Sequence, residues 1–313
     1  MKRVCITGAA GNLGGLTSRY LINTSDCLLN LMVHHRDVHP DIRRNERVKV
    51  FKCDLNNRES LNDCIEGVDV IVHYAGVLFS AHPEKFLPTT NTKYFENLVS
   101  VAKEKGVKRI VLISFPHVEG PTYFDSPSTN RLDKTPISFH AKTRLEEEKI
   151  LMREYPGGVV LRVGMVYGNG ILMPDVARWL AKKWLLGIWK EPTWIHLISK
   201  DDFLEAVKSA VLKERITGTY NIGDDGNQTL QEYLNFACAV WKCKRPWRMP
   251  EWMIYTAANI CEAASALFGI KSPLTKDFID IGKVSYYGDT TRMKKDLLPI
   301  LKYATMKDGV EIF

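Results

Sequence analysis

The chain has 313 residues, of which 45% are hydrophobic and 25% charged. This composition supplies a large core for one or two domains and argues against intrinsic disorder. The 43 basic and 36 acidic residues give a net charge of +7, which favours anionic small ligands and is too diffuse to indicate nucleic acid. The seven cysteines form no CxxC pair, and an odd count without such pairs favours reduced thiols and a cytoplasmic location.

The first half alternates short β-branched runs with helical patterns. Between the expected strands, runs such as NLGGLTSRYLIN and AKTRLEEEKILMREY have helical periodicity. Strands of nearly continuous apolar character that alternate with helices predict an α/β protein with a doubly wound parallel sheet. The expected strands cover residues 3–7, 29–34, 48–53, 68–74, 108–114 and 158–164.

The second half is less regular. Loop signals such as YGNG, GDDGNQT and KRPWRMP follow Gly164, and all seven tryptophans lie between Trp179 and Trp252. We expect a nucleotide-binding domain over 1–165, to which residues at about 195–222 return, and a smaller, mostly helical, discontinuous cap over 166–313. The apolar run 253–270 contains Glu262 and is too short and mild to span a bilayer, so it predicts a buried or half-buried helix.

A glycine-rich turn, TGAAGNLG, follows the first strand and opens a helix. Gly8 permits the tight turn, Gly11 lets the backbone approach a pyrophosphate, and Gly14 allows close helix–strand packing. The helix N-terminus then offers free N–H groups and a positive dipole end to phosphates. The position after a first strand predicts nucleotide binding, with contacts at Gly8, Ala10, Gly11, Asn12 and Leu13.

The G-x-x-G-x-x-G spacing resembles the short-chain dehydrogenase/reductase superfamily in its extended form, the NAD(P)-dependent epimerase/dehydratase group. Further segments match its motifs in order over almost the whole chain: FKCDLNN, VHYAGV, NTKYFENL, RVGMVYGNG and GTYNIGDDG. The resemblance implies a Rossmann-type sheet with a substrate cap. It implies cofactor contacts at Asp54, Leu55, Ala75 and Gly76, and places Arg162 and Tyr167 in a segment that closes over the nicotinamide.

The end of the second expected strand decides the form of the cofactor. An acidic residue there would bind the ribose 2′-hydroxyl of NAD, but the chain reads MVHHRD. The cations of His35 and Arg36 suit a 2′-phosphate, so the sequence favours NADP(H). NAD(H) stays open as the alternative, with Asp37 binding the ribose and Arg36 a solvated surface charge.

Members of the family carry Tyr-x-x-x-Lys on one helix face, where the lysine lowers the tyrosine pKa and the tyrosine exchanges the proton. This chain retains Lys142 but has Ser138 at the tyrosine position. In SFPHVEG, Phe115 aligns with the usual catalytic serine, and Ser114 precedes it. The departures argue against ordinary alcohol–ketone chemistry and leave cofactor binding untouched.

Three nearby groups are candidates to replace the lost acid. Tyr123 lies in a loop expected over the site, Glu119 follows the fifth strand, and His140 stands two residues before Lys142. His140 would point elsewhere on the helix, so its surface interpretation is preferred. Lys142 itself is a candidate proton donor, with a purely structural ribose contact as the alternative. The candidate catalytic set is therefore Lys142, Tyr123, Ser114 and Ser138.

The cap predicts the substrate class. Residues 175–197 hold four tryptophans at five-residue spacing, which drifts round a helix, so most of these rings are expected to pack locally. The tail 273–299 resembles the branch with hydroxysteroid dehydrogenases and dihydroflavonol reductases, which favours a small, mainly apolar substrate. Nearby lysines leave peripheral membrane contact open. No metal site or nucleic-acid partner is expected, and a homodimer is open. The rival functions are a non-catalytic NADP(H)-sensing protein and a nucleotide-sugar epimerase or dehydratase.

Overall fold

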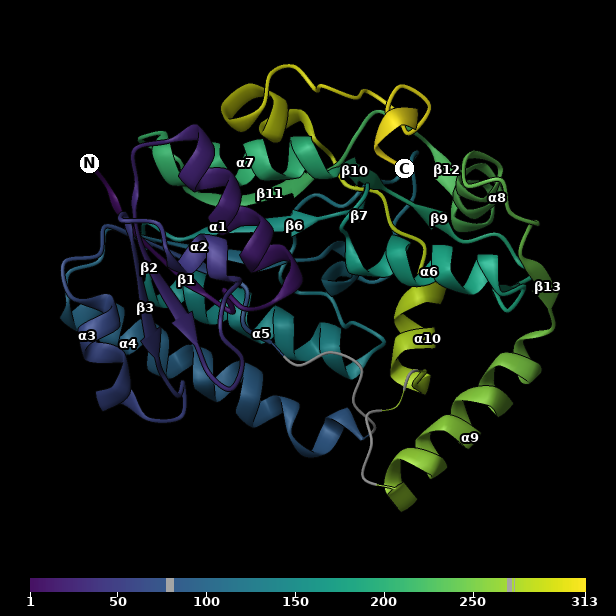
Figure 1. Ribbon diagram of the computed structural model, residues 1–313, viewed down its shortest axis with the longest axis horizontal. Helices are drawn as coiled ribbons and strands as arrows, with labels where there is room; N and C mark the ends of the chain where they lie inside the picture. The colour runs from purple at the N-terminus through teal and green to yellow at the C-terminus, as the bar shows by residue number, and fades with distance from the viewer. Residues whose placement is uncertain (77–81, 269–271, 273) are drawn as a thin grey trace.

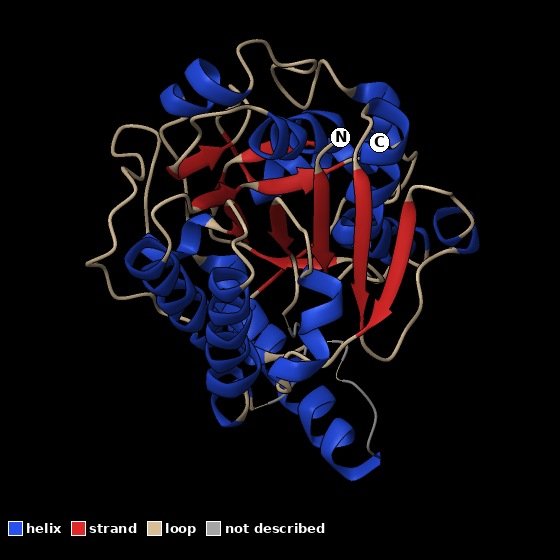
Figure 2. Ribbon diagram, turned by 90° about the vertical axis from the view of Figure 1, so that its left-hand side faces the viewer, coloured by secondary structure: helices blue, strands red, loops and turns tan. Residues whose placement is uncertain are grey.

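The computed structural model describes residues 1–76, 82–268, 272 and 274–313. Its centre is a seven-stranded sheet in the order β11-β6-β5-β4-β1-β2-β3, in which every neighbouring pair is parallel. Figure 2 shows the strands between two layers of helices. The sheet confirms the Rossmann-type α/β fold. The strands are β1 (Arg3–Thr7), β2 (Leu28–Val33), β3 (Val48–Lys52), β4 (Val70–His73), β5 (Arg109–Ser114), β6 (Val159–Val163) and β11 (Gly218–Ile222).

Successive side chains of each strand point to opposite faces, so one strand serves both layers. On β1, Val4 and Ile6 join the core that α1 (Asn12–Thr24) and α7 (Lys200–Leu212) cover. Cys5 faces the opposite core, under α3 (Asn62–Ile65), α4 (Tyr94–Glu104) and α5 (Phe139–Glu154). Figure 1 shows these two groups of helices on either side of the sheet. Short helical segments join the elements: α2 (Pro40–Arg43), η1 (Arg58–Leu61), η2 (Pro83–Lys85), the π-helix η3 (Pro88–Lys93) and η4 (Pro116–Glu119).

The cap is built from small two-stranded sheets and helices around a third core, which includes Trp189, Tyr233 and Trp241. β11 pairs with β6, so the chain re-enters the central sheet after the first cap strands. The cap elements are β7 (Met165–Tyr167), α6 (Leu172–Lys182), β8 (Gly187–Trp189), β9 (Trp194–Ile195), β10 (Leu197–Ser199), β12 (Gln228–Thr229), α8 (Leu230–Val240), β13 (Trp247–Met249), α9 (Glu251–Phe268), α10 (Lys276–Lys283) and η6 (Val310–Ile312). The π-helix η5 (Met293–Leu297) instead packs into the first core beside α7.

The apolar run forms helix α9, which is half-buried as expected: Ile254 and Ala258 are buried, whereas Ile260 is 65% exposed. Among the four tryptophans of residues 175–197, Trp189 is buried, and Trp179, Trp184 and Trp194 are partly exposed. A sequence pattern does not say which of these apolar side chains a neighbouring element covers. Among the described residues, no helix is both long and apolar enough to cross a bilayer.

Candidate cofactor and catalytic site

The glycine turn after β1 has the geometry that its spacing predicts. Gly8 has φ +67°, in the left-handed region, and a Cβ there would lie 3.1 Å from the amide nitrogen of Ala75. A Cβ on Gly14 would collide with the carbonyl oxygen of Gly8. The turn therefore requires glycine at Gly8 for backbone conformation and at Gly14 for close packing.

Helix α1 begins after this turn without a capping side chain. Gly11 is its N-cap residue and makes no side-chain cap hydrogen bond, so the first amides of the helix remain available for an anion. The amide of Ala9 donates to the carbonyl of Met32 at 3.4 Å, which holds the turn beside the end of β2. An uncapped helix N-terminus at the carboxyl edge of a parallel sheet fits the pyrophosphate of a dinucleotide cofactor.

Asn12 makes a contact that the sequence did not predict. Its side-chain amide donates to the carbonyl of Gly170 at 2.7 Å, and its oxygen accepts from the amide of Leu172 at 3.0 Å. The side chain therefore ties the start of α1 to the loop before α6. Its backbone N–H is still placed for a phosphate at the helix N-terminus.

The end of β4 faces the same turn. The Thr7 hydroxyl accepts from the amides of Tyr74 and Ala75, both at 3.2 Å. Gly76 follows, and a Cβ there would lie 3.0 Å from the guanidinium of Arg144. Small residues at Ala75 and Gly76 thus let a buried cation of α5 approach the backbone beside the glycine turn.

Arg144 was missed by sequence reasoning, because a charged residue two positions after Lys142 suggests a solvated helix face. Its side chain is buried and pairs with the equally buried Glu147, one turn further along α5. Burial raises the pKa of Glu147 to about 7, against the lowering effect of Arg144. Among the residues that the structure describes, Nε of Arg144, Oε1 of Glu147 and Oδ1 of Asn91 are buried without hydrogen-bond partners, so this part of the site has polar groups available to a ligand.

In the segment after β2 the basic side chains are exposed, whereas the carboxylate of Asp37 is already hydrogen-bonded within the protein. His34, His35 and Arg36 are exposed, and in the described part of the structure Arg36 has no ion-pair partner. Asp37 instead accepts from Arg43 and from the amide of Val38, and these contacts lower the pKa of Asp37.

Asp54 and Leu55 lie just after β3. The Asp54 carboxylate accepts from the amide of Asn56 at 2.9 Å, and the Leu55 carbonyl accepts from Asn97 at 2.9 Å. These bonds shape the turn beside which the resemblance places the adenine.

Ser114, at the end of β5, joins a buried ionic network. Its hydroxyl donates to Glu148 on α5, and Glu148 also accepts from the fully buried Arg162 on β6. Arg162 donates in addition to Glu119, which accepts from the hydroxyl of Ser128 at 2.7 Å. Glu119 is thereby committed to Arg162. Neither carboxylate is a free acid, and Arg162 serves the packing of β6 against α5.

Ser138 begins α5. Its hydroxyl accepts from the amide of Ala141 at 3.1 Å, and the side chain is nearly buried. Asp277 of α10 accepts from the amide of Phe139 at 3.0 Å. Lys142 is exposed, and its Nζ lies 5.4 Å from the centre of the Phe139 ring. Of the polar groups on this first turn, Lys142 is the one that solvent or a ligand reaches.

The surface interpretation of His140 is wrong, because its side chain is buried, with 6% of the residue exposed. Its ring stacks on that of Phe115, with ring centres 5.3 Å apart. The ring centre of His117 lies 5.2 Å from that of the same Phe115. Burial lowers the pKa of each histidine to about 3, and the Arg144 charge adds to the effect at His140. Two neutral imidazoles therefore flank the residue that replaces the usual serine.

His117 was also missed by sequence reasoning. It packs against Tyr286, with ring centres 4.4 Å apart, and both of its nitrogens are buried. Its position two residues after Phe115, in η4, is the only signal that the sequence offered.

Tyr123 lies in a tight turn, where its amide donates to the carbonyl of Ser126 at 3.2 Å. Its side chain is exposed, as are those of its neighbour Phe124 and of Ile137 and Phe139 around the start of α5. The phenol is therefore accessible.

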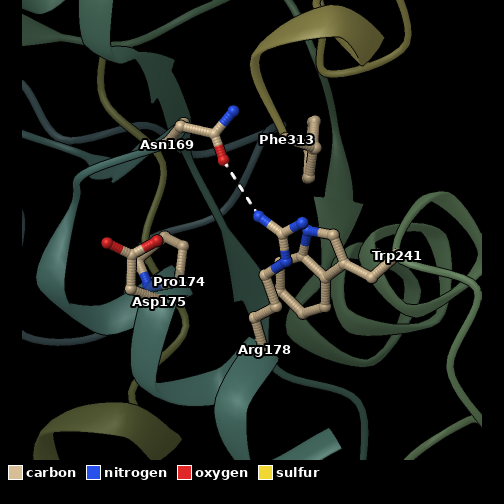
Figure 3. A pocket seen from close by; sticks show the side chains of 7 residues that line it. Asn169, Pro174, Asp175, Arg178, Trp241 and Phe313 are labelled. Carbon is tan, nitrogen blue, oxygen red and sulfur yellow. Dashed lines mark hydrogen bonds between the residues drawn. The ribbon is translucent and has the colours of Figure 1, made fainter. Parts of the chain in front are cut away.

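A small recess lies elsewhere, on the cap. Figure 3 shows the Arg178 guanidinium pointing toward Asn169, to which it donates at 3.2 Å. Residues of the glycine turn do not line it. The residues that line the recess are Gly168, Asn169, Pro174, Asp175, Arg178, Trp241 and Phe313.

In the described residues no cluster of histidine, cysteine, aspartate or glutamate is arranged to hold a metal ion.

Comparison with known proteins agrees with this geometry. Residues 8–153 match the model of an NAD(P)H-binding family. The chain is 24% identical to the uronate dehydrogenase of Pseudomonas putida over 73% of its length and 78% of that protein. It is 21% identical to a 3 beta-hydroxysteroid dehydrogenase/Delta 5→4-isomerase of Vaccinia virus over 54% of each chain.

Solved structures share the whole fold. The dTDP-glucose 4,6-dehydratase of Bacillus anthracis, in complex with NAD, has a TM-score of 0.76 at 17% identity, covering 99% of this chain and 94% of that one. The UDP-glucuronic acid 4-epimerase of Bacillus cereus, in complex with UDP-glucuronic acid and NAD, has a TM-score of 0.74 at 16% identity, covering 99% and 97%. The glycine turn, the seven-stranded sheet and the matched region together show that the chain contains an NAD(P)H-binding domain of Rossmann-type fold.

Proposed function

We propose that this chain is an NADP(H)-dependent oxidoreductase that acts on a small, mainly apolar substrate. The observation that carries the proposal is the meeting of three elements at one edge of the sheet. The uncapped start of α1, the Ala75–Gly76 turn and the start of α5 with Lys142 all follow or face carboxyl ends of strands. In parallel α/β sheets, ligands bind at this edge.

The cofactor-binding residues are proposed from this arrangement. The backbone of Gly8 to Leu13 would hold the pyrophosphate, Asp54 and Leu55 the adenine, and Ala75 and Gly76 the turn toward the nicotinamide. His35 and Arg36 would hold a 2′-phosphate, because both are exposed and the neighbouring Asp37 is paired with Arg43. When bound, the nicotinamide supplies or accepts a hydride.

Two of the four candidate catalytic residues suit a positioning role, and the other two are accessible to a substrate. The hydroxyls of Ser114 and Ser138 are held by Glu148 and by the amide of Ala141, which suits positioning. Lys142 and Tyr123 are exposed. We therefore propose Lys142 as the ribose contact and a proton donor to substrate oxygen, with Tyr123 as the alternative donor.

His140 joins this set as a result of the structure. Its ring is buried and stacks on Phe115. As a neutral imidazole it would donate one hydrogen bond to a carbonyl oxygen without carrying charge. The exposed Phe124, Ile137 and Phe139 nearby support an apolar substrate.

The experiment is a turnover assay with NADPH or NADP⁺ on a steroid ketone–alcohol pair, with glucuronate and UDP-glucuronate as polar comparisons. We expect turnover of the apolar pair, and loss of a general acid usually costs roughly 10²–10⁴-fold in rate, so Lys142→Ala should fall by that order. Lys149→Ala, on the same helix and paired with Glu146, is the matched control and should leave the rate unchanged. Oxidation of glucuronate alone would overturn the substrate class.

A second candidate is a non-catalytic NADP(H)-binding protein that signals cofactor state to a partner. The engagement of both serine hydroxyls by protein groups favours it. One relative with 26% identity over 54% of this chain is the Methionine adenosyltransferase 2 subunit beta of Danio rerio. Tight NADPH binding without turnover of any of the three substrates would support this candidate. Conversion of UDP-glucuronate without net change in cofactor would instead support the epimerase alternative.

A further inference from the structure

Two loops at the outer end of the cap expose large apolar side chains side by side. We define the cap-tip patch as residues 182–185, after α6, and 242–247, before and at the start of β13. Trp184 is 59% exposed, Leu185 64% and Trp247 62%. The Nε1 of Trp247 donates to the carbonyl of Trp184 at 2.9 Å, and the amide of Trp247 donates to Leu186 at 2.9 Å. The two loops thus form one surface.

One residue in each loop of the patch has an unfavourable backbone conformation. Trp184 has φ +61° and Lys242 has φ +56°, a left-handed conformation that bulky residues rarely adopt. Such conformations cost free energy and persist where surrounding contacts enforce them. The exposure of Trp184 is therefore imposed by the turn at the end of α6.

Cations surround the exposed rings. In the described part of the chain no acidic side chain forms an ion pair with any of them, and the nearby Glu251 is paired with Lys283. The Nζ of Lys244 lies 3.5 Å from the centre of the Trp184 ring, so charge and aromatic surface are in direct contact. The exposed cations of the patch are Lys182, Lys183, Lys242, Lys244 and Arg245.

Helix α9 extends the apolar surface. It follows β13 directly, and its first turn exposes Trp252 and Met253, with exposed fractions of 68% and 42%. Figures 1 and 2 show α9 projecting from the body of the molecule. Contiguous exposed apolar residues of this extent mark an interaction surface in a folded protein.

We propose that the cap-tip patch binds the surface of an anionic lipid bilayer. Tryptophan and leucine insert at the boundary of headgroups and acyl chains, and lysine and arginine contact lipid phosphates. The charge is complementary to such a surface. A symmetric contact between two copies would instead bring the same five cations together, which disfavours it. Single-stranded nucleic acid would stack on the rings but would leave Leu185 and Met253 without partners.

The test is co-sedimentation of the full chain with vesicles of phosphatidylcholine alone and of phosphatidylcholine containing about 30% phosphatidylserine, a typical anionic surface. We expect binding to the anionic vesicles that weakens as salt is raised. The variant Lys244→Ala with Arg245→Ala should bind roughly 30-fold more weakly, from a loss of about five- to sixfold per cation. The matched control is Lys49→Ala with Lys307→Ala, two exposed cations outside the patch, which should bind as the wild type does.

The apolar part is tested by Trp184→Ser with Leu185→Ser, against Ile300→Ser, which alters another highly exposed apolar side chain (83% exposed). We expect the patch variant to lose vesicle binding and the control to keep it, with unchanged melting temperature and NADPH affinity in both. Equal binding to neutral and anionic vesicles, or none to either, would overturn the proposal. So would binding of an oligothymidylate in place of vesicles, or a concentration-dependent dimer that the patch variant abolishes. NADPH turnover is a separate readout, so its absence would bear on the proposed function and not on this surface.

Discussion

The hydroxyl of Ser138 accepts a hydrogen bond from the amide of Ala141 at 3.1 Å and so caps helix α5. The residue at the position of the family's tyrosine therefore supports the helix that carries Lys142. A serine cap of this kind is favourable because it satisfies an amide that has no partner within the helix.

We expect Ser138→Ala to lower the free energy of unfolding by about 1 kcal/mol, the usual cost of a lost N-cap. Ser138→Asp should keep the stability, because an aspartate side chain accepts the same bond. Chemical denaturation of the three proteins measures the difference. An alanine variant as stable as the wild type would show that the cap contributes nothing.

Disruption of the buried network of Arg162, Glu119 and Glu148 should lower the free energy of unfolding by more than the loss of the Ser138 cap does. Replacement of Arg162 by methionine leaves two buried carboxylates without their cation, and such losses cost about 3–5 kcal/mol. Arg153→Met removes an arginine of an exposed ion pair with Glu154 and should change stability by less than about 0.5 kcal/mol. Urea unfolding of both variants tests this contrast, and equal effects would contradict it.

Cofactor preference should depend on two arginines near the end of β2. We expect Arg36→Ala to weaken NADPH binding by about 1.5–3 kcal/mol, the range for charge-assisted hydrogen bonds, and to leave NADH unchanged. Arg43→Ala should strengthen NADH binding, because it frees the Asp37 carboxylate. Calorimetric titration of both cofactors measures these changes, with Arg44→Ala as the control. If Arg36→Ala binds NADPH as well as the wild type does, the 2′-phosphate assignment is wrong.

The glycine turn provides a test of the pyrophosphate site. Gly11 has φ −81°, so its backbone accepts a side chain, and a Cβ would lie 3.0 Å from the Gly8 carbonyl oxygen. Gly11→Val should therefore abolish NADPH binding, because its side chain stands where the pyrophosphate approaches, while circular dichroism shows an intact fold. Retained binding in the folded variant would contradict the site.

Asp224 predicts a pH dependence of stability. It is fully buried, one of its oxygens has no hydrogen-bond partner, and burial raises its pKa from 3.8 to about 8. The folded state therefore holds the proton more tightly than the unfolded state. Stability from this group is fully present below about pH 4 and is lost as the pH rises to about 8. A pKa shift of this size corresponds to at most about 6 kcal/mol.

Asp224→Asn should remove this dependence, because asparagine is uncharged at every pH. We expect similar unfolding free energies for both proteins at pH 4 and a more stable variant at pH 8, measured by urea unfolding across that range. A wild-type curve with the same slope as that of the variant would show that Asp224 is already ionised in the folded protein.

Much of this architecture could be predicted because its signals are local. The glycines of TGAAGNLG specify a turn through backbone conformation and close approach, and Gly8 adopts the positive φ that this requires. Continuous apolar strands such as RIVLIS specify burial on both faces, and β5 has that burial. Each signal depends on a few neighbouring residues, so the sequence by itself determined the sheet and the site of the cofactor turn.

The tertiary structure decided which polar groups are free. Ser114, Glu148 and Arg162 lie on β5, α5 and β6, and only the packing of these three elements brings them into one network. Burial of His140 likewise depends on Phe115 from another element. Whether α9 and Trp184 are covered depends on the neighbours that the fold places beside them. Hydrogen-bond partners and solvent exposure arise from distant segments meeting in space, and periodicity along one segment carries no information about them.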